Sequence, residues 1–161
     1  MVLSEEQRQR VRAALEVAPL GDYPTALASL HTAAELHQFV LRYNCNDGLG
    51  PLWYVIRSSH CDHGTALYIY WLISDVWQVE ERRENSDAEW DFSGLAHEIE
   101  ERCSSGFFVS QSIAYDPKPD LGWNRVSEYR YRRLVEQGRA RVPSYMLEPT
   151  PGTPMQRDPG L

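Results

Sequence analysis

The fold of this 161-residue chain is decided by two stretches, Tyr43-Asn-Cys-Asn-Asp-Gly48 and His60-Cys-Asp-His-Gly-Thr-Ala-Leu67. Both are clusters of the small polar residues that occur in turns and helix caps. They bracket one short aromatic segment, Pro51 to Ile56, and an apolar run from Ala66 to Ile73 follows them. This pattern is typical of two helix junctions around a short helix, and an active site is the alternative that it leaves open.

Helix signals extend outward from this centre. Asp62 is placed to cap a helix that runs to about Trp77 and is apolar on all sides, which predicts the most buried helix of the protein. Ser4-Glu-Glu-Gln7 and Thr32-Ala-Ala-Glu35 both have the capping-box pattern, which predicts helices to about Val17 and to about Tyr43. A further helix is expected from about Asp87 to Cys103.

The C-terminal third is less regular. Residues 107–115 predict a short strand or an extended arm. Residues 148–161 contain four prolines and two glycines, which predicts a tail without fixed structure unless it docks on the domain. The sequence therefore predicts a mainly α-helical, compact single domain of five to six helices over residues 1–147, followed by a C-terminal tail, 148–161.

Charge is unevenly distributed. The whole chain has a net charge of −7, and residues 74–104 alone carry ten acidic residues against three arginines. Such a stretch repels nucleic acid and anionic membranes and attracts a basic protein. A solvated helix face is the plainer interpretation. If the stretch binds a partner, the expected contact residues are Glu80, Glu81, Glu84, Asp87, Trp90 and Asp91.

Several classes of protein are disfavoured by the composition. The longest apolar run is too short to cross a membrane, and the N-terminus has no signal-peptide pattern, so we expect a cytoplasmic protein. Three irregularly spaced cysteines predict free thiols rather than a disulfide framework. No set of residues has the spacing of a zinc site, and no cofactor is expected.

The two junctions have a chemical and a structural interpretation. In the chemical interpretation, Cys61 is a nucleophile served by His60 and Asp62, with Asn44 and Asp47 nearby, although triads are usually assembled from distant segments. In the structural interpretation, Asp62 caps a helix and Cys61 is a small buried hydrophobe. The residues expected to build that structural junction are Tyr43, Asn44, Asp47, Asp62, Gly64 and Thr65.

The same residues carry a family resemblance. Tyr43-Asn-Cys-Asn-Asp-Gly48, Pro51-Leu-Trp53, and Cys61-Asp-x-Gly-Thr-Ala-Leu67 with the aromatic pair at 70–71 resemble a bacterial family, domain of unknown function 4274. Its members commonly have Trp and Asp where this chain has Cys45 and Asn46. The resemblance implies a small, mostly helical bacterial protein and implies no activity.

Two functions are therefore expected as alternatives. The favoured one is a non-enzymatic acidic domain that binds another protein, most sharply an immunity or antitoxin protein that neutralises a basic toxin. This expectation rests on charge and on analogy with small acidic proteins of that kind. The other is a small cytosolic enzyme with a Cys/His/Asp site where residues 44–47 meet residues 60–62.

Overall fold

A computed structural model of the chain describes residues 2–74 and 91–161, and it is mainly α-helical, as predicted. The described residues form eight α-helices: α1 (Glu5–Val17), α2 (Tyr23–Ala28), α3 (Ala33–Arg42), α4 (Gly50–Arg57), α5 (His63–Ile73), α6 (Phe92–Ser104), α7 (Pro117–Asp120) and α8 (Arg125–Glu136). Three 3-10 turns, η1 (Ala18–Leu20), η2 (Cys45–Asp47) and η5 (Ser144–Leu147), and two strands, β1 (Ile113–Ala114) and β2 (Thr153–Pro154), complete them.

The helix count exceeds the expected five to six because two of the helices, α2 and α7, are very short. They have six and four residues, and each has proline in its first two positions. Proline is tolerated there because the first N–H groups of a helix have no partner within the helix.

The predicted starts of α1, α3 and α5 are found in the structure, whereas the start predicted at about Asp87 lies outside the described residues and α6 begins at Phe92. Ser4 and Gln7 form the complete capping box of α1. Thr32 caps α3 by accepting from the Glu35 N–H, but the Glu35 carboxylate accepts from His31 N at 3.1 Å rather than from the backbone of Thr32. Asp62 caps α5, which ends at Ile73 rather than at about Trp77.

The core is centred on α5, as its apolar sequence predicts. Seven of its eleven residues are buried, and it packs between α3 and α6. Leu67, Ile69 and Tyr70 are at most 1% exposed. Trp71 donates its indole N–H to the carbonyl of Met146 at 2.7 Å, which fixes η5 against the same helix.

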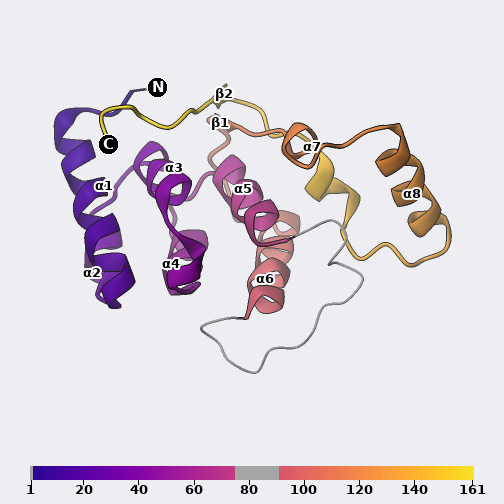
Figure 1. Ribbon diagram of the computed structural model, residues 1–161, viewed down its shortest axis with the longest axis horizontal. Coiled ribbons are helices and arrows are strands. Elements are labelled where there is room, and N and C mark those ends of the chain that lie inside the picture. The colour runs from indigo at the N-terminus through magenta and orange to yellow at the C-terminus, as the bar shows by residue number, and fades with distance from the viewer. Residues whose placement is uncertain (1, 75–90) are drawn as a thin grey trace.

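Figure 1 shows the helices following one another across the molecule from α1 to α8, with residues 148–161 returning along one edge to α1. This returning segment, called the C-terminal strap below, docks on the domain. Its β2 pairs in parallel with β1, with Ile113 opposite Thr153. Asp158 is 5% exposed and accepts from Leu3 N and Arg8 Nε, while Gln38 bonds the backbone of both Gln156 and Asp158.

None of the described helices has the length and apolar character that a membrane crossing requires.

Candidate functional site

Asp62 is a structural centre of the second junction, residues 60–67; the first junction is residues 43–48. Its side chain is fully buried, and its carboxylate accepts five hydrogen bonds. Gly64 N donates at 2.9 Å, which caps α5. The other donors are Ser112 N at 2.7 Å, Ile113 N at 3.3 Å and the hydroxyl groups of Ser110 and Ser112 at 2.6 and 3.0 Å. One carboxylate therefore both starts the central helix and holds the segment that leads into β1.

Gly64 and Thr65 complete this junction. A Cβ at Gly64 would overlap the carbonyl oxygen of Ile113 and approach Thr150 Oγ1 at 3.0 Å, so only glycine lets β1 pass this close to α5. Thr65 Oγ1 lies 3.0 Å from Nδ1 of His37 on α3. Burial lowers the pKa of His37 to about 4, so the imidazole is neutral at physiological pH.

The Cys61, His60 and Asp62 side chains do not form a nucleophilic set. Cys61 is 2% exposed, and burial, with the nearby charge of Asp62, raises the pKa of its thiol far above the ordinary value. A cysteine nucleophile needs the opposite shift, because the thiolate is the reactive species. His60 is exposed, and the Asp62 carboxylate is occupied by the donors described above.

The first junction lies apart from this chemistry. Tyr43 is buried and donates its hydroxyl to the carbonyl of Gly48 at 2.9 Å, while Asn44 accepts from Asn46 N in a local turn. Asp47 is exposed at the end of η2. Across the described ranges, no hydrogen bond or ion pair joins Asn44 or Asp47 to His60, Cys61 or Asp62.

The residues described by the structure contain no cluster of three or more His, Cys, Asp or Glu side chains that could hold a metal ion. The cysteines, Cys45, Cys61 and Cys103, all lie in the described ranges and are free thiols.

Most of the predicted acidic contact surface lies outside the described residues: Glu80, Glu81, Glu84, Asp87 and Trp90. Asp91 is described. It caps α6 by accepting from Gly94 N at 2.7 Å. It also lines a groove that the sequence did not predict.

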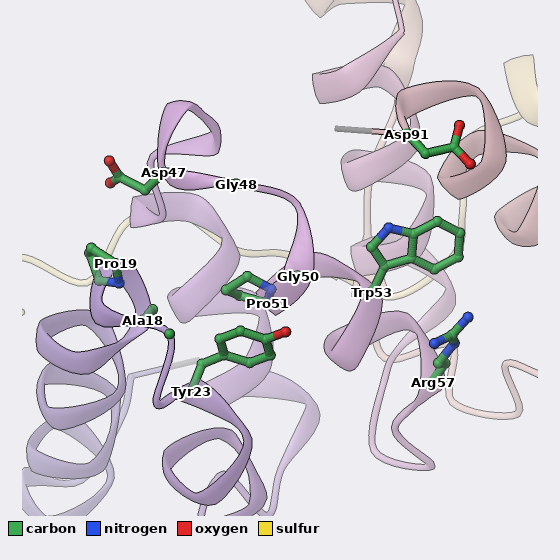
Figure 2. Close-up of a pocket in the computed structure, with 11 residues that line it drawn as sticks. Ala18, Pro19, Tyr23, Asp47, Gly48, Gly50, Pro51, Trp53, Arg57 and Asp91 are labelled. Carbon is green, nitrogen blue, oxygen red and sulfur yellow. The ribbon is translucent and has the colours of Figure 1, made fainter. Parts of the chain in front are cut away.

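This groove, about 560 Å³ in volume, lies between η1, the start of α2, the η2–α4 junction and Asp91 (Figure 2). Six of the residues that line it are alanine, glycine or proline and are called the floor below, and the rings of Tyr23 and Trp53, called its aromatic walls, also line it. A second hollow of about 460 Å³ continues along α4 and shares both aromatic residues and Arg57. The full lining is Ala18, Pro19, Gly21, Tyr23, Asp47, Gly48, Gly50, Pro51, Trp53, Arg57 and Asp91.

The groove contains one neutralised charge and several unpaired polar groups. The Arg57 guanidinium lies 4.7 Å from the centre of the Trp53 ring and makes a bidentate contact with Glu98 at 2.9 and 2.8 Å. This contact lowers the pKa of Glu98 below its usual range. By contrast, the Asp47 carboxylate, the Tyr23 hydroxyl and the Trp53 indole N–H have no hydrogen-bond partner among the described residues.

The sequence did not single out Tyr23 or Gly50. In the structure Trp53 is partly buried and packs against the edge of the core, and Tyr23 lies against the backbone of Gly50, where a Cβ would overlap its hydroxyl oxygen. The glycines at 48 and 50 beside Trp53 were the available signal, since glycine next to an aromatic residue permits a close approach of another group.

The comparisons with known proteins add a family and nothing further. A search of curated proteins found no match, and a search of solved structures found none either. The family model described as Domain of unknown function (DUF4274) matches residues 31–104, which run from the cap of α3 to the end of α6 and include both junctions. The match includes the junction residues that carry the resemblance, and the resemblance to this family is thereby confirmed.

Proposed function

We propose that the protein is a non-enzymatic binding domain that docks a basic surface of another protein on the face containing the groove. In the sharpest form of this proposal it is a cytoplasmic immunity or antitoxin protein that neutralises a basic toxin. The groove carries the proposal: it combines two partly buried aromatic side chains with carboxylates at its edge.

The chemistry of the groove suits a protein partner. Interface anchors are enriched in Trp and Tyr, because these rings bury a large area and offer one polar atom. Trp53 and Tyr23 present such rings, each with its polar atom unpaired in the described part of the chain. Asp47 and Asp91 add negative charge, and Asp91 belongs to the acidic stretch of the sequence. Complementary charge chiefly accelerates association, while buried aromatic anchors slow dissociation.

The enzymatic alternative is less well supported. It requires Cys61 as a nucleophile, and burial keeps that thiol protonated. Asp62 serves the backbone of residues 64, 112 and 113 rather than a histidine. Substitution of Cys61 by Ser is therefore expected to leave the biological function intact.

Gene order and co-expression test the proposal. The immunity role expects the gene to lie directly downstream of a large secreted-toxin gene. Co-expression of the chain should then restore growth to cells that produce the toxin domain. Protection should be lost in Trp53→Ala, and circular dichroism should show that this variant is still folded at the growth temperature, although loss of a side chain packed against the core lowers its melting temperature. The matched control is Tyr129→Ala on α8, which is 63% exposed and lies far from the groove, and it should protect fully.

Two outcomes would contradict the proposal. If Trp53→Ala and Asp47→Arg, tested as separate variants, both protect fully, the groove is not part of the interface. Loss of protection in Cys61→Ser, with a normal melting temperature, would restore the enzymatic alternative. With a binding partner in hand, charge reversal at Glu80, Glu81 and Glu84 should slow association and weaken its salt dependence.

A further inference from the structure

We infer that the groove accommodates an extended, arginine-containing segment of the basic partner, with a guanidinium group paired to Asp47 and stacked on an aromatic wall. This inference rests on the proposed function and specifies which side chain the site recognises. Three features of the groove support it: its charge, its aromatic walls and its floor.

The charge of the groove favours a cation. Asp47 is exposed and has neither a hydrogen bond nor an ion pair with any described residue, and within the described ranges the side chain of Asp91 accepts only from the N–H of Gly94. Among the described residues, the cation that lines the groove is Arg57, which is held by Glu98, and Glu98 also contacts Arg102. Negative charge at Asp47 and Asp91 is therefore not compensated by the groove's own arginine. Figure 2 shows these two carboxylates on opposite sides of the groove, with Tyr23 and Pro51 between them.

The aromatic walls favour arginine over lysine. A guanidinium is planar and weakly hydrated, so it can stack on a ring while donating two parallel hydrogen bonds to a carboxylate. The protein already contains this arrangement at the edge of the groove. Arg57 stacks on Trp53 and at the same time makes its bidentate contact with Glu98. An incoming arginine would repeat it with Tyr23 and Asp47.

The floor favours an extended backbone. It is made of alanine, glycine and proline, and the absence of larger side chains lets another main chain approach closely. Helix α4 begins at this floor, at Gly50, without a side-chain cap.

A short peptide serves as the probe. Acetyl-Gly-Arg-Gly-Arg-Gly-amide is titrated into the full chain at low salt, and the indole N–H signal of Trp53, assigned with Trp53→Phe, is followed by NMR. We expect a saturable shift with a Kd of about 1 mM, as suits a small ligand with few contacts. The same peptide with citrulline, which is neutral and nearly the same shape, should bind at least about fivefold more weakly. The lysine version should lie between them.

Matched variants locate the interaction. Asp47→Asn should weaken the arginine peptide about fivefold, since it removes one solvent-exposed ion pair. Because Asp47 makes no hydrogen bond or ion pair with any described residue, this variant should fold normally. Tyr129→Ala should leave the affinity unchanged.

Equal binding of the arginine and citrulline peptides, or no saturable shift up to about 20 mM peptide, would overturn the inference. The proposed function would survive this result if Trp53→Ala still abolished protection, because the partner would then use the groove without an arginine. The proposed function itself would be refuted by a different result, namely full protection by the groove variants.

Discussion

Replacing Asp62 with alanine should destabilise the protein far more than the loss of one helix cap. The cap on Gly64 N contributes about 1 kcal/mol. Ile113 is 1% exposed, so its N–H would be left buried without a partner, at a cost of about 1–3 kcal/mol. The bonds from Ser110 and Ser112 are more accessible to water, and together they add about 1 kcal/mol. We therefore expect a loss of about 4 kcal/mol, which for a chain of this length lowers the melting temperature by about 8–16 °C.

The assay is thermal and urea unfolding followed by circular dichroism, with Ser4→Ala as the matched control. Ser4 also caps a helix, but it is exposed and makes no long-range hydrogen bond, so its loss should lower the melting temperature by only about 2–4 °C. Asp62→Asn should fall between the two, because it keeps the shape but turns one acceptor into a donor facing Ser112 N. If Asp62→Ala lowers the melting temperature no more than Ser4→Ala does, the structural reasoning is wrong. An unchanged melting temperature with lost biological function would favour catalysis instead.

Two further predictions concern the same junction. Gly64→Ala should lower the free energy of unfolding by about 3 kcal/mol, because its Cβ meets backbone at Ile113, which cannot move aside without shifting β1. Gly160→Ala is the control: its Cβ meets only the flexible side chain of Arg8, and an equal loss there would contradict the explanation. The pH dependence of stability should also contain a contribution from His37. Its folded pKa of about 4 lies below the unfolded value of 6.5, so unfolding takes up a proton between these values. The stabilisation from neutral His37 is therefore fully present above pH 6.5. The free energy of unfolding falls as the pH drops from 6.5 through about 4, by about 3 kcal/mol in total. Urea unfolding at several pH values, compared with His37→Gln, measures it, and identical pH slopes in the two proteins would refute it.

The local part of this fold was readable in the sequence because capping acts over three or four residues. The pair Ser4 and Gln7 predicts the start of α1. Asp62, with the apolar run after it, predicts the start of α5. The other donors to Asp62 were not readable. Ser112 lies 50 residues further along the chain, in a segment with no periodicity that points back to the junction. Composition likewise marked residues 148–161 as irregular but could not say whether they dock, because docking depends on single contacts such as that of Gln38 with Asp158.

The groove was not predicted for the same reason. Its walls come from Tyr23 at the start of α2 and from Trp53 on α4, and no sequence pattern indicates that these two rings line one groove. Tyr23 can lie against the start of α4 because Gly50 has no side chain, which is a property of the space between helices. The predicted acidic contact surface stays a prediction, apart from Asp91, which lines the groove.

The C-terminal strap has a consequence for the order of events during synthesis. Leu3 N reaches Asp158 across 155 positions of sequence, and Gln38 and Arg42 on α3 also bond to residues 156–158. Contacts between such distant positions close late, because a large loop must be ordered first. On the ribosome, α1 and α3 therefore emerge early, and the edge of these helices that contacts residues 156–158 stays exposed until those residues have been synthesised. A chain stalled or cut near residue 150 would keep the core of α5 yet leave this edge open, and its vulnerability to proteases should appear at α1 first.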